Sequence, residues 1–194
     1  MNISHLLLLA GWSLYCVLHS LLADDRYKTK ISESLDLSGS GYRLSYNIFA
    51  LVSLVAILFY HFSVESPRLF GSIIFKEWVA PIIILFGLTG MVICIIKYFR
   101  QLSGISKIQE KKEPILETRG VHRYVRHPLY LFTFVFLTGL FLYQPTLSNL
   151  IALTIIITYT VIGIRFEEKK LVKEFGDQYV AYQNKVPMLI PFSK

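Results

Sequence analysis

Long apolar runs separated by polar segments dominate the chain. Five of them approach the length of about 20 residues that a helix needs to cross the hydrocarbon core of a bilayer. The runs cover residues 4–23, 44–64, 79–99, 129–143 and 147–164. Because apolar stretches of this length are typical of membrane helices, the pattern predicts an all-α integral membrane protein with about five transmembrane helices.

The link between the fourth and fifth runs is very short. Only Gln144, Pro145 and Thr146 separate them, so the two runs are predicted to form a helical hairpin. The fourth run is short by itself, but Tyr124 and Val125 extend it. The first run lacks the basic start and the A-x-A site of a cleaved signal peptide, and we therefore expect it to be a mature helix.

The polar segment after the fifth run carries apolar side chains at helical spacing. Leu171, Phe175, Tyr179 and Tyr182 share one face, which is interrupted at Gly176. This spacing predicts amphipathic C-terminal helices at the membrane interface. The apolar stretch that follows, VPMLIPF, is expected to fold back against the bilayer or the helix bundle.

No repeat, low-complexity tract or linker divides the chain into two cores. We therefore predict a single membrane domain over residues 1–194, in which residues 1–96 contain three N-terminal spans and residues 97–194 form the other half. Residues 24–43 are predicted to be a polar loop that is flexible at its SGSG stretch. The longest loop, 97–127, contains a short apolar patch and is expected to be structured.

Composition supports the membrane assignment. Hydrophobic residues make up 54% of the chain and charged residues only 17%, whereas a soluble domain has about a quarter of its residues charged. The two cysteines, Cys16 and Cys94, lie inside predicted spans and are expected to be reduced packing residues. No metal-ligand spacing, phosphate-binding loop or dinucleotide glycine motif is present in the sequence.

Isolated histidines and aromatic residues of the first half have simple structural interpretations. The histidines at 5, 19 and 61 are expected to be interfacial or hydrogen-bonded core residues. An aromatic belt at the membrane surface is the expected location of Trp12, Tyr42, Tyr46 and Trp78.

Positive charge is distributed unevenly among the loops. Residues 24–43, 97–128 and 165–194 hold four, eight and six lysines and arginines, whereas residues 65–77 hold two. With five spans, the three basic segments share one side of the membrane, which the positive-inside rule places in the cytosol. We therefore expect the N-terminus outside and the C-terminus inside. The net charge of +7 is explained by anionic lipid, so no nucleic-acid partner is expected.

Arg126 and His127 stand directly before Pro128, at the start of the fourth apolar run. One interpretation is interfacial snorkelling of basic side chains. The other is anion binding, because a helix N-terminus already favours anions through its free N–H groups and its dipole.

Glu167 and Glu168 lie at the end of the fifth span. We expect Glu168 to be solvated beside Lys169 and Lys170. The predicted hairpin brings Glu167 to the same level as the start of the fourth run. One site would then offer cations to a carboxylate and an anion to an ammonium group, which suits an amino-acid zwitterion such as S-adenosylmethionine.

Two stretches of the second half resemble a known family. ILETRGVHRYVRHPLY, the short hairpin and RFEEKKLVKEFGDQYVAYQNKVPMLIP are similar to the C-terminal signature of the isoprenylcysteine carboxyl methyltransferases, integral-membrane relatives of the phospholipid methyltransferases. The last stretch also resembles the methanethiol S-methyltransferases. The resemblance covers residues 97–191. It implies a membrane enzyme that takes S-adenosylmethionine as methyl donor and releases S-adenosylhomocysteine, with its cofactor site in the second half and the acceptor side in the first.

The resemblance also implies roles for single residues. The adenosine end of the cofactor would be walled by Pro114, Ile115, Leu116 and Glu117. The amino-acid and ribose portions would contact His127, Pro128, Leu129 and Tyr130, and Glu167 would take the ammonium or ribose hydroxyls. His122 stands where the family usually has a tyrosine and is a candidate for adenine stacking or for a base. Arg126 or Arg165 would orient the substrate.

The methyl acceptor is left open by the sequence. A prenylated cysteine carboxylate, a small thiol and a phospholipid amine all fit a lipophilic or small acceptor. Two alternatives to a methyltransferase remain: a membrane sterol-reductase-like enzyme that uses NADPH, and a non-enzymatic membrane scaffold or sensor. The oligomeric state is not predicted.

Overall fold

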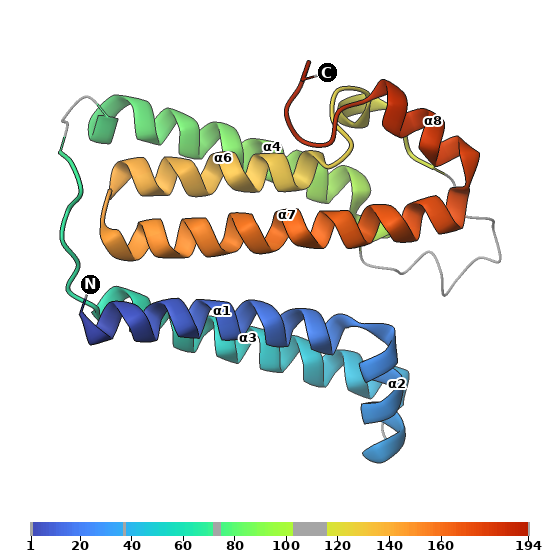
Figure 1. Cartoon of the computed structure of the whole chain (residues 1–194), viewed down its shortest axis with the longest axis horizontal. Helices are drawn as coiled ribbons and strands as arrows, with labels where there is room; N and C mark the ends of the chain where they lie inside the picture. The colour runs from blue at the N-terminus through green and yellow to red at the C-terminus, as the bar shows by residue number, and fades with distance from the viewer. Residues whose placement is uncertain (1, 37, 72–74, 103–115, 194) are drawn as a thin grey trace. The chain divides into compact units, whose positions relative to one another are not determined.

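The fold is described from a computed structural model, which describes residues 2–36, 38–71, 75–102 and 116–193. Over these residues the chain is helical, without strands, and its only pairing of extended backbone is an isolated bridge between Arg68 and Thr146. The helices are α1 (Ile3–Ala23), α2 (Asp25–Ser34), α3 (Gly39–Ser63), the π-helix η1 (Phe75–Val79), α4 (Ala80–Leu102), the 3-10 helix η2 (Gly120–Arg123), α6 (Pro128–Tyr143), α7 (Leu147–Phe175) and α8 (Asp177–Lys185) (Figure 1). The predicted all-α membrane class is confirmed.

Four of the described helices are long and apolar enough to cross a membrane. These candidate spans are Ile3–Ala23, Gly41–Ser63, Lys76–Lys97 and Leu147–Phe175. The fourth predicted span corresponds to α6, a shorter apolar helix of 16 residues that begins at Pro128, so Tyr124 and Val125 do not extend it. The count of five spans therefore stays a prediction.

The chain forms two compact units. The first contains Met1–Phe70 and Pro145–Tyr159, and the second contains Gly71–Gln144 and Thr160–Lys194. Helix α7 contributes its first part to one unit and its last part to the other. The predicted boundary between residues 96 and 97 falls inside α4, and a single membrane domain with two functional halves stays a prediction.

A series of polar side chains linked by hydrogen bonds lies in the core of the first unit. Trp12 and Leu8 of α1 pack there with Ala152 of α7. The indole N–H of Trp12 donates to Nδ1 of His61 at 3.3 Å, and Nε2 of His61 lies 2.8 Å from Oδ1 of Asn149. His5 is also buried and lies 3.2 Å from the hydroxyl of Ser66. These contacts confirm the prediction of hydrogen-bonded core histidines.

Two residues assigned to the aromatic belt are core residues instead. Trp12 and Tyr42 are both buried, so their belt assignment is wrong. The reason is that each polar atom has a partner inside the unit: Tyr42 donates its hydroxyl to the carbonyl of Leu22 at 2.8 Å. Trp78, by contrast, is 69% exposed.

The predicted polar loop at 24–43 is largely helical. Its first part forms α2, and its SGSG stretch begins α3. The hydroxyl of Ser38 accepts a hydrogen bond from the amide of Gly41 at 3.1 Å and so caps the helix. A serine cap satisfies an otherwise unpaired N–H group, which is why this stretch starts a helix instead of forming a flexible loop.

Helices α4 and α6 of the second unit pack side by side (Figure 1). Glycines permit this close approach. A Cβ atom at Gly87 would lie 2.5 Å from the backbone nitrogen of Phe136, and one at Gly90 would lie within 2.4 Å of the ring of Phe132. On α6, a Cβ at Gly139 would lie 2.8 Å from Ile84. Small residues at such contacts are a common device for packing membrane helices.

The predicted C-terminal apolar face is carried by the last part of α7 and by α8, and its place at the membrane interface stays a prediction. Helix α7 ends at Phe175, and Gly176 adopts a φ of 55° and a ψ of −134° before α8 begins. A positive φ of this kind favours glycine. Tyr179, Tyr182 and Val186 form a buried cluster. Its half-buried neighbours are Leu116, Leu171, Val172 and Phe175. The predicted apolar face is therefore confirmed, and it packs within the second unit. Both cysteines are free and buried, also as predicted.

Candidate active site

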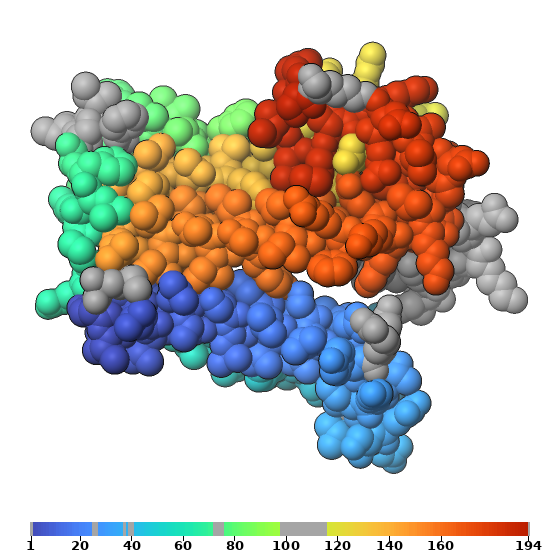
Figure 2. Space-filling model, viewed as in Figure 1, coloured from blue at the N-terminus to red at the C-terminus, as the bar shows by residue number. Residues whose placement is uncertain are grey.

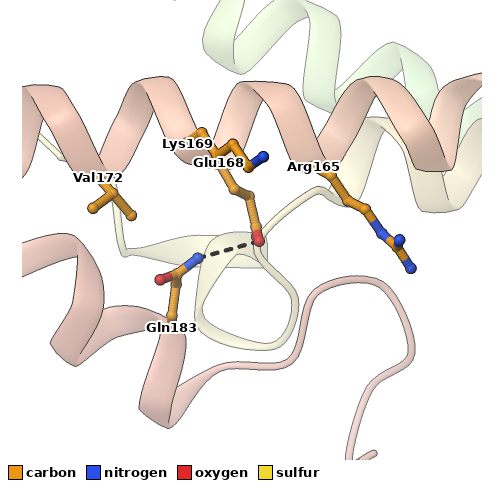
Figure 3. Close-up of a pocket in the computed structure, with 5 residues that line it drawn as sticks. All are labelled: Arg165, Glu168, Lys169, Val172 and Gln183. Atoms are coloured by element: carbon orange, nitrogen blue, oxygen red, sulfur yellow. Dashed lines mark hydrogen bonds between the residues drawn. The ribbon is translucent and has the colours of Figure 1, made fainter.

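The carboxylate of Glu168 is the centre of a polar cluster in the second unit. Its Oε1 lies 2.6 Å from Nε of Arg126 and 3.1 Å from Nε2 of His127, and it accepts the hydroxyl of Tyr179 at 3.4 Å. Its Oε2 accepts the side-chain amide of Gln183 at 3.2 Å (Figure 3). The cluster thus joins the loop before α6, the end of α7 and helix α8.

The prediction that Glu168 is solvated is wrong. The side chains of Glu168 and Arg126 are only 13% and 10% exposed. A nearly buried charge requires a partner and hydrogen bonds, and Arg126 provides both. The prediction was based on Lys169 and Lys170, the sequence neighbours of Glu168. The actual partner is Arg126, which is 42 positions away.

Arg126 holds the C-terminal segment as well as Glu168. Its Nη1 donates to the carbonyl oxygens of Gln183 at 3.1 Å and Val186 at 2.5 Å. Two of the guanidinium nitrogens are therefore engaged by protein acceptors. This geometry favours a positioning role for Arg126 over direct orientation of a substrate.

The chain after α8 folds back onto the start of α6. The amide of Arg126 donates to the carbonyl of Pro187 at 2.9 Å, and that of His127 donates to the carbonyl of Met188 at 3.2 Å. In Figure 2, atoms of the red C-terminal segment surround part of the yellow segment that precedes α6. The predicted fold-back is confirmed. These hydrogen bonds occupy the backbone N–H groups of Arg126 and His127, so neither N–H group can bind an anion.

Tyr130 and Glu167 form the more accessible side of the cluster, next to the buried His127. The rings of His127 and Tyr130 stack with centroids 5.8 Å apart. The Tyr130 hydroxyl donates to Oε2 of Glu167 at 3.2 Å, and Nδ1 of His127 lies 4.0 Å from the same oxygen. The side chain of Glu167 is 46% exposed. Its carboxylate is thus oriented by the protein and open to a ligand.

The predicted adenosine wall is described in part. Pro114 and Ile115 lie outside the described residues. Leu116 packs against the tyrosine cluster of α8, and Oε1 of Glu117 accepts the amide of Arg119 at 2.8 Å. The contact of Leu116 places the segment against α8, and the hydrogen bond of Glu117 is local to the segment.

Two further predicted residues belong to the start of α6. Pro128 is its first residue and is buried, and Leu129 is half-buried. Proline suits this position because the first N–H of a helix has no intrahelical partner. Pro128 therefore marks where α6 begins, directly beside the polar cluster.

His122 lies in η2, and its carbonyl oxygen accepts the hydroxyl of Tyr182 at 2.6 Å. Burial lowers the pKa of the His122 imidazole below its ordinary value of 6.5. Burial disfavours the charged form of tyrosine too, and it therefore raises the pKa of the Tyr179 hydroxyl. His122 is therefore neutral at physiological pH and able to accept a proton, whereas Tyr179 keeps its proton.

Arg165 occupies a different face of α7 from Glu167. Two positions along a helix are about 200° apart around its axis. Arg165 lines an open pocket of about 380 Å³ (Figure 3). The other lining residues are Glu168, Lys169, Val172 and Gln183. Arg165 and the accessible pair of Tyr130 and Glu167 are thus not brought together.

The spacing of apolar residues in α7 indicates that Glu168 is buried, and the prediction of a solvated Glu168 did not use it. Ile164, Leu171 and Phe175 are buried or half-buried. Glu168 continues their spacing, since residues four, seven and eleven positions apart share one helix face. An acidic residue in such a stripe indicates a buried charge with a distant partner. Tyr179 and Gln183 were also not foreseen as partners of Glu168, and nothing local in the sequence indicates that contact.

Comparison with known proteins identifies the family. The family model for phospholipid methyltransferases matches residues 75–178. Methanethiol S-methyltransferase 1 of Bradyrhizobium diazoefficiens is 30% identical over 99% of this chain and 67% of its own length. The methanethiol S-methyltransferase of Crocosphaera subtropica is 29% identical over 92% of this chain and 71% of its own.

A third relative has a different name. The protein-S-isoprenylcysteine O-methyltransferase of Saccharomyces cerevisiae is 37% identical over 46% of this chain and 38% of its own length. No solved structure matches the chain. These relatives favour neither the reductase nor the scaffold alternative. The chain belongs to the phospholipid methyltransferase family and is an integral membrane methyltransferase.

Proposed function

We propose that the chain transfers a methyl group from S-adenosylmethionine to the sulfur of a small thiol. The observation that carries this choice of acceptor is the extent of the similarity. The two relatives named methanethiol S-methyltransferase align with 99% and 92% of the chain. That alignment includes the first half, from which we expect the acceptor pocket to come.

The accessible residues of the polar cluster fit part of the cofactor. An ammonium group or a ribose hydroxyl donates hydrogen bonds, and Glu167 offers an oriented, half-exposed carboxylate as acceptor. Arg126 is a poor partner for the cofactor's carboxylate, because Nε and Nη1 already bind protein oxygens. The cofactor contacts of Leu116, Glu117, His127, Pro128, Leu129 and Tyr130 remain proposals, as do those of Pro114 and Ile115.

Methyl transfer from a sulfonium is an in-line displacement. The bound cofactor supplies the methyl carbon and leaves as a neutral thioether. The protein's task is to hold the acceptor sulfur and the methyl carbon in line. In this proposal Glu167 and Tyr130 fix the donor, while Arg126 and Glu168 keep His127 in place. The acceptor thiol loses its proton, and the neutral imidazole of His122 is the proposed base.

A second acceptor has its own support. The yeast isoprenylcysteine O-methyltransferase has 37% identity over its matched region. A carboxylate acceptor is ionised at neutral pH, since an α-carboxyl titrates at about 3.3 to 3.7. It would need no base, and this difference separates the two acceptors by experiment. For either acceptor we propose that the site faces the cytosol, with the N-terminus outside, as the distribution of lysine and arginine predicts.

Replacing Glu167 by glutamine tests the cofactor site. We expect isothermal titration of the detergent-purified protein to show S-adenosylhomocysteine binding that is at least tenfold weaker in Glu167→Gln, because a charge-assisted hydrogen bond is lost. Glu174→Gln, an exposed change on the same helix, is the matched control and should bind normally. NADPH in a parallel titration should not bind. Equal affinity in wild type and Glu167→Gln would contradict the proposed role of this residue.

The pH profile of thiol methylation tests His122. A general base acts in its neutral form, so a lowered pKa keeps it active to lower pH. We expect the acidic limb of kcat/KM to lie below about pH 6.5. In His122→Gln the limb should disappear and the rate should fall about 100-fold or more. Initial rates with a small thiol between about pH 5 and 9 provide the measurement. An unchanged limb in the variant would remove His122 from the mechanism.

A further inference from the structure

One face of α7 changes from apolar to basic where the helix enters the polar part of the second unit. Ile162, Arg165, Lys169 and Val172 lie within about 80° of one another around the helix axis. Ile162 is 50% exposed, and Arg165 and Lys169 are exposed as well. The last three residues line the open pocket of about 380 Å³ that Figure 3 shows.

The charges that line this pocket are not balanced within it. Glu168 is its acidic member, but both of its oxygens are bound, Oε1 mainly by Arg126 and Oε2 by Gln183. Across the part of the chain that the structure describes, neither Arg165 nor Lys169 has a carboxylate within ion-pair distance. Lys169 instead lies 5.7 Å from the ring centre of Phe166. The pocket therefore offers two cations to an anion.

The surroundings indicate an amphiphilic anion. On the membrane side of the two cations, the exposed side chain on the same face of α7 is Ile162. Gln183 of α8 also lines the pocket and contributes a polar side chain to it. A phosphate joined to an acyl chain matches this order, because basic side chains at the interface attract anionic headgroups while the apolar side chains stay in the hydrocarbon.

We propose that this pocket binds the phosphate of a phospholipid from the surrounding bilayer, with its acyl chain along Ile162. The lipid would link α7 to α8 directly beside the buried pair of Arg126 and Glu168. It would be a bound structural lipid, not the methyl acceptor. This proposal does not depend on the identity of the acceptor.

Native mass spectrometry of the purified chain with added phosphatidylglycerol tests this site. This lipid has a phosphate and no amine, so its binding is separate from methylation of a headgroup amine. We expect one lipid to be retained by the wild type and its affinity to fall about tenfold or more in Arg165→Gln/Lys169→Gln, since each cation contributes about 1 kcal/mol at an anionic lipid surface.

The matched control is Lys170→Gln/Lys185→Gln, which removes the same charge from exposed positions outside the pocket. It should retain the lipid. Equal loss in both double variants would indicate attraction by net charge alone and would overturn the proposal. So would unchanged binding in the pocket variant. Thermal unfolding checks that both variants are folded, and competition by millimolar inorganic phosphate would show a site for free phosphate instead of lipid.

Discussion

Replacing Glu168 by alanine is expected to destabilise the protein by about 3–5 kcal/mol, because it leaves a buried cation without its partner. Arg126 is only 10% exposed and would lose the carboxylate at 2.6 Å. The hydroxyl of Tyr179 and the amide of Gln183 would lose their acceptor as well. Denaturant unfolding of the detergent-purified protein, followed by tryptophan fluorescence, measures the effect, and methyl transfer should fall with it.

The adjacent glutamate is the matched control. Glu167→Ala removes the same group from a half-exposed side chain with one close hydrogen bond. We expect it to cost at most about 1 kcal/mol of stability while still losing cofactor affinity. The double variant Arg126→Met/Glu168→Leu removes both charges and should lose less stability than Glu168→Ala. Equal stability of the two single glutamate variants would show that the buried pair does not hold the site together.

Replacing Gly87 by alanine is expected to separate α4 from α6. The added Cβ would lie 2.5 Å from the backbone nitrogen and 2.8 Å from the Cα of Phe136. Backbone atoms cannot rotate away as a side chain can, so the helices must shift. We expect a loss of about 1–3 kcal/mol or more, measured by the same unfolding experiment.

Gly163→Ala is the corresponding control on α7. A Cβ at Gly163 would meet nothing within 4 Å. Alanine should therefore be neutral there, or stabilising by up to about 1 kcal/mol through its higher helix propensity. If the two glycine variants behave alike, close contact between α4 and α6 is not what requires a glycine at position 87.

The helices follow from the sequence because a membrane span is a local pattern. Each long apolar run is visible without knowledge of its neighbours, and the break at Gly176 has a local cause in its positive φ. α6 is less certain as a span because its 16 residues are fewer than the usual length. The length of the apolar run does not by itself decide whether α6 crosses the membrane.

The errors concern polar side chains whose partners are distant in sequence. Glu168 was expected in solvent, and Trp12 at the membrane surface. Each is buried because a partner arrives from another helix: Arg126 lies 42 positions from Glu168, and His61 lies 49 positions from Trp12. Burial of a polar group depends on such a partner, and composition and periodicity do not specify which residue it is. For Glu168, its place in the apolar stripe of α7 is the available clue.

The return of the C-terminal segment to the start of α6 has a consequence for biosynthesis. Proteins are made from the N-terminus, and early segments can fold before later ones exist. The backbone contacts of Arg126 and His127 are with Pro187 and Met188, so they cannot form until the ribosome has added those residues. The membrane helices can therefore be inserted first. The start of α6 and the polar cluster beside it obtain these backbone contacts only after residues 187 and 188 have been added.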